Sequence, residues 1–176
     1  MLEEATGSDL SKITKDEMLE LCDANSIKID KNSNIGQILD ALMSNLVEPK
    51  LINPTFVIDY PKSISPLAKL NRDGSKDIVE RFELFIGGFE FANSFSELND
   101  PLDQRSRLEE QSKLRDQGDE EAQPIDEDFI KAMEIGMPPT GGVGIGIDRL
   151  VMLLTNNRWI RDVILFPTMK SEKEKK

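Results

Sequence analysis

Residues 80–95 read ERFELFIGGFEFANSF, and this stretch decides the fold. Residues that favour strands, chiefly phenylalanine with leucine and isoleucine, fill both halves, and Gly87-Gly88 separates them. Two such runs joined by two glycines predict a β-hairpin with strands over 80–86 and 89–95. The sequence therefore predicts a sheet that contains antiparallel strands.

A two-residue turn also predicts the register of the hairpin. The expected cross-strand pairs are Ile86 with Phe89, Phe85 with Glu90 and Glu83 with Ala92. Directly opposed residues share a face, so Glu83 and Glu90 lie on one face as diagonal neighbours. Two carboxylates held close together repel each other unless a cation lies between them, which makes this pair a candidate Mg²⁺ site. The alternative is an ordinary solvated polar face.

Asn93, Phe95 and Glu97 form a second set of polar and aromatic residues at a spacing of two. Strict alternation places this set on the face opposite to Glu90, so one pocket for all of these residues requires a β-bulge between Glu90 and Asn93. Glu97 beside Phe95 is suited to an alkylammonium group, through an ion pair and a cation–π contact. The alternative is that Phe95 belongs to the core and Glu97 is an ordinary acid before a helix.

A second strand pattern occupies residues 141–150, which read GGVGIGIDRL. Glycines at 142, 144 and 146 alternate with Val143, Ile145 and Ile147. A period of two predicts a strand, with its apolar side chains facing a core. The bare glycine face indicates that something approaches the backbone closely. Gly142, Gly144 and Gly146 are therefore candidates for the floor of a nucleotide site.

Asp148 and Arg149 follow this strand at the start of a predicted buried helix over 150–154. A helix N-terminus favours anions, so arginine there is unfavourable unless a bound phosphate compensates it. Arg149 is therefore a candidate phosphate ligand, and the alternative is a surface ion pair of little energetic value. The G-x-G-x-G series matches neither the dinucleotide fingerprint nor the P-loop.

Helices surround these strands in the predicted architecture. A capping box at Thr14-Lys15-Asp16-Glu17 begins one helix, and apolar residues at helical spacing over 35–47 predict another. The remaining predicted elements are a strand over 55–60, a helix from Pro101 through Leu114, a helix capped by Asp126 or Asp128 that ends near Gly136, an acidic loop over 118–124 and a short apolar segment over 163–166. This order predicts an α+β fold with a mainly antiparallel sheet.

Composition narrows the class of protein. The 176 residues predict one domain, and a net charge of −11 makes a free-standing domain a poor nucleic-acid binder. The absence of histidine excludes histidine-based catalysis and histidine metal sites. The single cysteine, Cys22, excludes an intrachain disulfide and fits a reducing compartment. With an acidic start unlike a signal peptide and no apolar run of membrane-spanning length, we expect a cytoplasmic protein without a membrane partner.

The sequence around the glycine strand, residues 138–150, resembles motif 3 of class II aminoacyl-tRNA synthetases. Other segments resemble the lysine-specific branch of that family, lysyl-tRNA synthetase: SPLAK at 65–69, ERFELF at 80–85, FSELNDP at 95–101, PIDEDF at 124–129 and IRDVILFP at 160–167. Aspartyl and asparaginyl relatives share the motif 3 pattern but not the combination of SPLAK with FSELNDP. The resemblance extends over residues 1–170.

The resemblance implies the class II antiparallel sheet with flanking helices, and an enzyme that uses ATP and Mg²⁺ to join lysine to tRNA(Lys) for translation. It implies ATP contacts at Glu83, Glu90, Gly142, Gly144, Gly146 and Arg149, with Mg²⁺ on Glu83 and Glu90. Arg149 would clamp the ATP phosphates as the catalytic residue. Lysine would contact Asn93, Phe95 and Glu97.

The chain also departs from the family pattern. It shows no anticodon-binding OB domain, no motif 1, which forms the family's homodimer, and no motif 2 with its Phe-Arg-x-Glu sequence. We expect residues 1–170 to be the C-terminal portion of the catalytic domain, with motif 3 at about 138–155 and a charged tail at 171–176. The alternatives are a truncated, inactive synthetase-like binding protein and a lysyl-adenylate-forming ligase that modifies a protein.

The 176-residue chain alone is expected to show no lysine-dependent exchange of pyrophosphate into ATP. The family's motif 2 supplies the arginine that contacts the α-phosphate, and that motif is not in the sequence. The exchange assay with labelled pyrophosphate measures this, and robust exchange by the chain alone would contradict it.

Apolar surface is also expected to be exposed on the isolated sheet.

Overall fold

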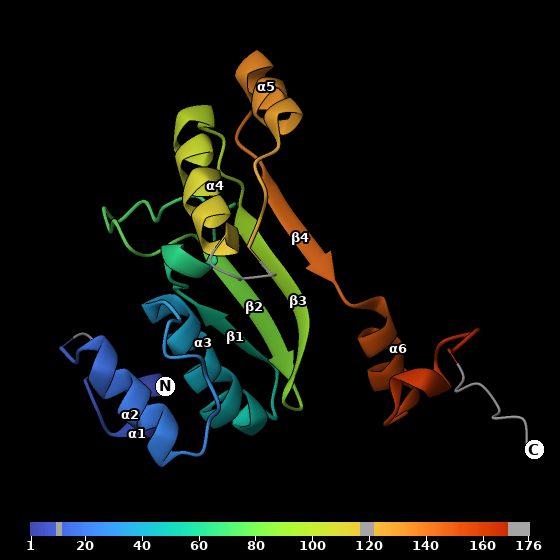
Figure 1. Ribbon diagram of the computed structural model, residues 1–176. Coiled ribbons are helices and arrows are strands. Elements are labelled where there is room, and N and C mark those ends of the chain that lie inside the picture. The colour runs from blue at the N-terminus through green and yellow to red at the C-terminus, as the bar shows by residue number, and fades with distance from the viewer. Residues whose placement is uncertain (10–11, 117–121, 169–176) are drawn as a thin grey trace, which may run out of the picture. The chain divides into compact units, whose positions relative to one another are not determined.

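The structure of the protein, a computed structural model, describes residues 1–9, 12–116 and 122–168 (Figure 1). The chain forms two compact units, residues 1–144 and residues 145–176. The predicted acidic loop over 118–124 lies partly outside the described residues, and the predicted tail over 171–176 lies entirely outside them.

A four-stranded sheet forms the centre of the first unit, with strand order β1-β2-β3-β4. The strands are β1 (Thr55–Ile58), β2 (Arg81–Ile86), β3 (Phe89–Ser96) and β4 (Gly141–Ile145). β2 pairs antiparallel with β1 and with β3, as the hairpin predicted. The predicted α+β class with an antiparallel sheet is therefore confirmed, with β1 and β4 at its edges.

The four predicted helices are present in this unit, and the structure adds α1, which the sequence did not predict. The helices are α1 (Leu2–Thr6), α2 (Lys15–Ala24), α3 (Ile35–Leu46), α4 (Pro101–Asp116) and α5 (Glu127–Gly136). The Thr14 capping box is confirmed: the Glu17 amide donates to Thr14 Oγ1 at 3.3 Å, and the Thr14 amide donates to Glu17 Oε2 at 2.7 Å. Asp126, rather than Asp128, caps α5. Among the described residues, no helix has the length and apolar character that crossing a membrane requires.

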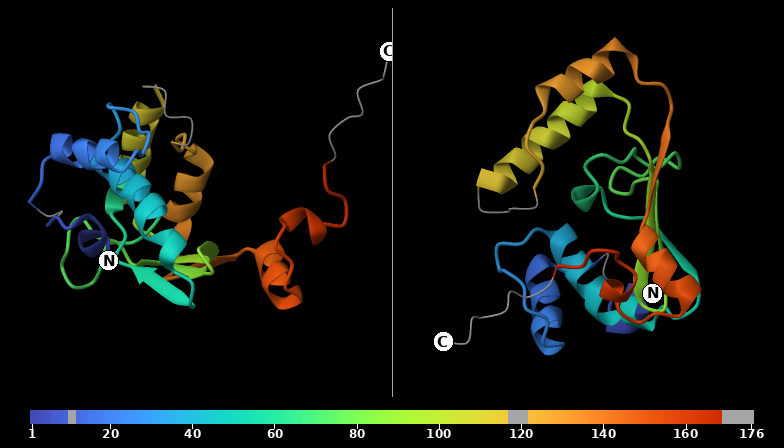
Figure 2. Two further views of the ribbon diagram at one scale, coloured as in Figure 1. Left: turned by 90° about the horizontal axis from the view of Figure 1, so that it is seen from below. Right: turned by 90° about the vertical axis from the view of Figure 1, so that its right-hand side faces the viewer.

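Helices α2 to α5 lie on the same side of the sheet (Figure 2). The contact is made through Phe85 of β2, which is 1% exposed and packs with Val47 and Leu51 after α3. The helices α2 and α3 share a second apolar cluster around Cys22 and Leu42. This side of the sheet therefore carries the core of the unit.

The opposite face of the sheet is apolar and open. Phe56 and Ile58 of β1 are 60% and 62% exposed, and they pair with Leu84 and Phe82 of β2. The rings of Phe56 and Phe82 meet edge to face, with centroids 5.2 Å apart. Exposed apolar surface on the sheet agrees with the prediction from the sequence.

The segment 65–69 runs from Ser65, which accepts a hydrogen bond from Arg81, to the bridge between Ala68 and Glu97, and it is held by α4. Gln104 Nε2 donates to the Pro66 carbonyl at 3.1 Å, and an Arg107 guanidinium nitrogen donates to the Ala68 carbonyl at 2.7 Å. Gln104 and Arg107 are both buried. Because buried donors bond this backbone directly, the SPLAK segment has a fixed position beside the end of β3.

A polar cluster lies beneath that segment, and we call it the Glu83 cluster (Tyr60, Ser65, Arg81 and Glu83). The Tyr60 hydroxyl donates to Glu83 Oε2 at 2.8 Å, and Arg81 donates to Glu83 Oε1 at 2.5 Å. Arg81 also donates to Ser65 Oγ at 2.8 Å, and its guanidinium lies 4.6 Å from the centroid of the Tyr60 ring. Glu83 is only 9% exposed, so the alternative of a solvated polar face is wrong for this residue.

The second unit contains α6 (Ile147–Thr155) and a 3₁₀ turn, η3 (Ile160–Asp162). The strand that was predicted to continue through Gly146 ends at Ile145, and Gly146 is the N-cap of α6. The predicted helix is present, but the prediction that it is buried is wrong, because α6 contains no buried residue. The described part of this unit has only one 3₁₀ turn besides α6, which is too little structure to cover the apolar face of that helix.

The apolar face predicted for the glycine strand is also more open than expected. Val143 is 64% exposed, so it does not face a core. The reason is the position of β4 at the edge of the sheet, whereas the buried cluster of this sheet forms around Phe85 on β2. A period of two predicts which residues share a face, but it does not predict which faces are covered.

The titration of Tyr60 tests the Glu83 cluster, because Tyr60 is the single tyrosine of the chain. Burial raises the pKa of Tyr60, and the negative charge of Glu83 and its hydrogen bond raise it further. The folded protein therefore holds the phenol proton more tightly than the unfolded chain does. This contribution to stability is fully present below the unfolded pKa of about 10 and is lost as the pH rises through the folded value.

Tyrosinate absorbance, followed against pH in native and denatured chain, measures this shift. We expect the native signal to appear only above the pH at which the denatured chain titrates. The Glu83→Gln variant should titrate at lower pH than the parent, because the charge is gone. A native titration that coincides with the denatured one would contradict the observed cluster.

Candidate functional site

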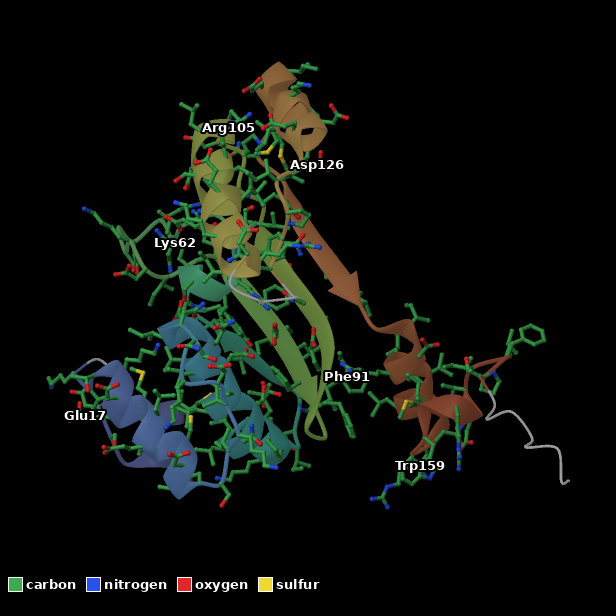
Figure 3. The ribbon with its side chains drawn as sticks, in the orientation of Figure 1. Glu17, Lys62, Phe91, Arg105, Asp126 and Trp159 are labelled. Atoms are coloured by element: carbon green, nitrogen blue, oxygen red, sulfur yellow. The ribbon has the colours of Figure 1, made fainter. Side chains whose placement is uncertain are left out.

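A β-bulge at Phe91, the residue labelled on β3 in Figure 3, determines which of the predicted site residues share a face. Phe85 pairs with Glu90 as predicted, but Leu84 pairs with Ala92, so Phe91 is an extra residue in β3. The prediction that Glu83 opposes Ala92 is therefore wrong, and Glu83 pairs with Asn93. A turn sets the register only as far as the first irregularity in the ladder.

The extra residue reverses the faces of all later residues of β3. Asn93 opposes Glu83 and Phe95 opposes Arg81, so these residues share the face that Glu90 occupies through its pairing with Phe85. Strict alternation, which placed Asn93 and Phe95 on the other face, gave a wrong prediction. The bulge between Glu90 and Asn93, which the sequence required for a common site, is confirmed.

Negative charge is concentrated on this face. Glu48, in the 3₁₀ turn η1 (Glu48–Lys50), lies near enough to Glu83 and Glu90 to interact with both charges. Burial raises the pKa of the Glu48 carboxyl, and the charges of Asp40, Glu83 and Glu90 raise it further. An environment of this kind favours a bound cation. Nothing in the sequence pattern indicated Glu48, because its turn has no periodicity.

The described residues contain no group of three or more acidic or cysteine side chains arranged to hold a metal ion by themselves. The face instead offers the two strand carboxylates, Glu83 and Glu90. Mg²⁺ commonly takes one or two carboxylates and completes its shell with phosphate oxygens and water. The arrangement therefore fits an ion that arrives on a phosphate ligand.

Asn93 has a buried side-chain oxygen, Oδ1, that accepts no hydrogen bond. Buried polar atoms are nearly always bonded, and leaving one without a partner costs about 1–3 kcal/mol. Such an acceptor is suited to a donor on a ligand. Phe95, by contrast, packs partly against the apolar cluster of Tyr60, Ala68 and Val79, in line with the core alternative for this residue.

Glu97 lies just beyond β3, against β4. Its amide donates to the Thr140 carbonyl at 2.9 Å, and its carboxylate occupies the space above Gly142. A Cβ on Gly142 would overlap Glu97 Oε1 and lie 3.2 Å from Cδ. A side chain at position 142 would therefore displace the Glu97 carboxylate from its observed position. The bare backbone that the sequence indicated is covered, at this position, by Glu97 itself.

A cavity of about 240 Å³ adjoins Glu97. Its lining includes Lys69, Arg72, Ser96, Glu97, Thr140 and Gly141. Lys69 donates to Asn99 Oδ1 at 3.0 Å, and Arg72 pairs with Glu80 at 2.9 Å, so both cations have partners. Glu97 is half-buried, and this burial raises the pKa of its carboxyl group. A cationic ligand group would stabilise the charged form of that carboxyl group.

The remaining predicted residues are placed as follows. A Cβ on Gly144 would lie 3.8 Å from the Asn93 carbonyl oxygen, an ordinary contact, so space alone does not require glycine there. Gly146 and Arg149 belong to the second unit, where Arg149 is exposed in the first turn of α6. Their contacts with ATP stay predictions.

Sequence reasoning missed Tyr60 and Arg81 as partners of Glu83. The signal for Arg81 was available, because it precedes Glu83 by two residues on one strand and must share its face. Tyr60 lies beyond the end of β1, so no strand pattern predicts where its hydroxyl points.

Comparison with known proteins agrees with this geometry. The family model described as tRNA synthetases class II (D, K and N) matches residues 6–170. The lysine–tRNA ligase of Leuconostoc mesenteroides subsp. mesenteroides is 52% identical over 173 residues, which are 98% of this chain and 35% of that protein. The lysine–tRNA ligase of a Synechococcus species is 55% identical over 174 residues, again 98% of this chain and 35% of the relative.

A third relative, the lysine–tRNA ligase of Porphyromonas gingivalis, is 49% identical over 172 residues, which are 98% of this chain and 30% of that protein. The chain thus spans about a third of the length of the curated relatives it matches. The family match covers nearly all of the chain, including the hairpin, its bulge and the glycine strand. The chain therefore belongs to the class II tRNA synthetases of the D, K and N group.

Proposed function

We propose that this chain supplies the lysine-binding wall and part of the ATP site of a lysine–tRNA ligase. The observation that supports the proposal most directly is the bulge at Phe91, because it brings Asn93 and Phe95 onto the face of Glu83 and Glu90. Relatives with 49–55% identity are named lysine–tRNA ligases, which favours lysine over aspartate or asparagine. Residues 1–170 would be the C-terminal portion of the catalytic domain.

The proposed reaction has two steps and belongs to translation in the cytoplasm. A carboxylate oxygen of lysine attacks the α-phosphorus of ATP, and pyrophosphate leaves to give lysyl-adenylate. A terminal ribose hydroxyl of tRNA(Lys) then attacks the lysyl carbonyl, and AMP leaves. Positioning and charge neutralisation accelerate such steps without a protein nucleophile or a histidine base.

Lysine recognition is assigned to the residues around Glu97. Its half-buried carboxylate would pair with a lysine ammonium group, which would offset the desolvation that raises its pKa. Phe95 would add a cation–π contact, and Asn93 would offer its unbonded Oδ1 to a donor of the substrate. A site that holds a charged end group in this way selects against neutral side chains.

ATP binding is assigned to the carboxylate pair and to the glycine strand. Glu83 and Glu90 would hold Mg²⁺ together with phosphate oxygens, and the ion would neutralise phosphate charge. Arg149 would contact the phosphates, and Gly142, Gly144 and Gly146 would line the adenosine side. The enzyme would form a homodimer through motif 1 of the family, which this sequence does not show.

A reconstituted enzyme tests the lysine assignment. We define it as the Leuconostoc mesenteroides relative in which residues 1–170 of this chain replace the matching segment. Glu97→Gln should raise the KM for lysine about tenfold or more, because a hydrogen bond to a charged group contributes about 1.5–3 kcal/mol. The KM for ATP should change little.

Pyrophosphate exchange at varied lysine and ATP concentrations measures both constants. Glu109→Gln, an exposed change on α4, is the matched control and should leave both unchanged. Equal losses for lysine and for ATP would argue against an ammonium partner at Glu97.

Gly142→Ala tests the packing of Glu97 against the glycine strand. The new methyl group would overlap Glu97 Oε1 and force the carboxylate to move, so the KM for lysine should rise as it does for Glu97→Gln. Gly141→Ala is the matched control, because its Cβ would meet no atom within 4 Å. An unchanged KM for lysine in Gly142→Ala, measured by the same assay, would show that this contact does not matter for the substrate.

A further inference from the structure

We propose that Tyr60 and Arg81 are positioning residues that fix the Glu83 carboxylate for the magnesium ion carried by ATP. The inference rests on the proposed function and extends it to two side chains outside the predicted site. It starts from the observation that each oxygen of Glu83 has one protein donor, Tyr60 on Oε2 and Arg81 on Oε1.

A carboxylate offers about four lone-pair directions to donors or cations. Tyr60 and Arg81 use one direction on each oxygen, which fixes the plane of the carboxyl group. The remaining directions are still available to a cation. Two donors at once therefore orient the carboxylate without consuming its capacity to bind an ion.

The two donors are themselves held by the fold. Tyr60 is 7% exposed, and Arg81 bonds both the Ile64 carbonyl at 3.0 Å and Ser65 Oγ at 2.8 Å. Ser65 opens the segment that the buried side chains of α4 hold by its carbonyls. The orientation of Glu83 is thus fixed before any ligand binds, which lowers the entropy cost of binding the ion.

Charge gives Arg81 a second role that Tyr60 lacks. Glu83 is buried near the charges of Glu48 and Glu90, and a buried charge is costly unless an opposite charge pairs with it. The Arg81 guanidinium supplies one, whereas the Tyr60 hydroxyl is neutral. Tyr60→Phe therefore removes an orienting bond and leaves the charges unchanged, which makes it the cleaner test.

The experiment measures metal binding and does not depend on turnover. In the reconstituted enzyme with ATP present, Mn²⁺ serves as the probe for Mg²⁺. The electron paramagnetic resonance signal of free Mn²⁺ is measured during a titration and gives the dissociation constant of the bound ion. Tyr60→Phe and Arg81→Lys should each weaken Mn²⁺ binding about tenfold, as losses of partners of metal ligands do. The KM for lysine should stay within twofold of the parent, and Arg105→Lys, in the exposed Arg105–Glu127 pair, should change neither value.

A double-mutant cycle with Glu83→Gln separates the possible outcomes. If Tyr60 acts through Glu83, Tyr60→Phe should have no further effect on Mn²⁺ binding in the Glu83→Gln background. A loss in Glu83→Gln with no loss in Tyr60→Phe and Arg81→Lys would overturn the positioning role and leave the proposed function standing. Unchanged Mn²⁺ binding in Glu83→Gln would overturn the ligand role of Glu83 and, with it, this inference.

Discussion

One extra residue in the β2–β3 ladder controls the chemistry of this face. Without Phe91 as a bulge, the residues after Glu90 would alternate in regular register, and Asn93 and Phe95 would point to the side of Phe56 and Ile58. With it, they share the helix-covered side with Glu83 and Glu90. The bulge disrupts the ladder locally, and in return it places two sets of polar residues on one rigid surface.

Two close contacts involve the carboxylates of this surface. Glu97 packs over Gly142, so the glycine strand provides room for a protein carboxylate as well as an open backbone. Tyr60 and Arg81 hold Glu83 from beneath the segment that α4 secures. The Glu83 carboxylate is oriented by hydrogen bonds from Tyr60, which is distant in sequence, and from Arg81 on the same strand. Such preorganisation is what binding by positioning and charge requires.

Local patterns predicted the elements well. The hairpin around Gly87-Gly88, the Thr14 capping box and the Asp126 cap are confirmed, because each depends on bonds between residues close in sequence. Burial was predicted less well: Val143 and α6 are exposed where a core was expected. An apolar pattern identifies a face that can be buried, and only the packing of other elements decides whether it is.

The sequence by itself determined the antiparallel hairpin, the helix starts and the candidate residues, from Glu83 and Glu90 to Glu97, since spacing and residue type define all of these. The tertiary structure alone decided that Asn93 and Phe95 share the face of Glu83 and Glu90, that Gly142 accommodates Glu97, and that Glu83 is held by Tyr60 and Arg81. The physical reason is that register and side-chain contact depend on where strands and loops meet in space. A bulge shifts the register of the strand pair by one residue. The sequence indicated where a bulge would be needed, but not whether the bulge forms.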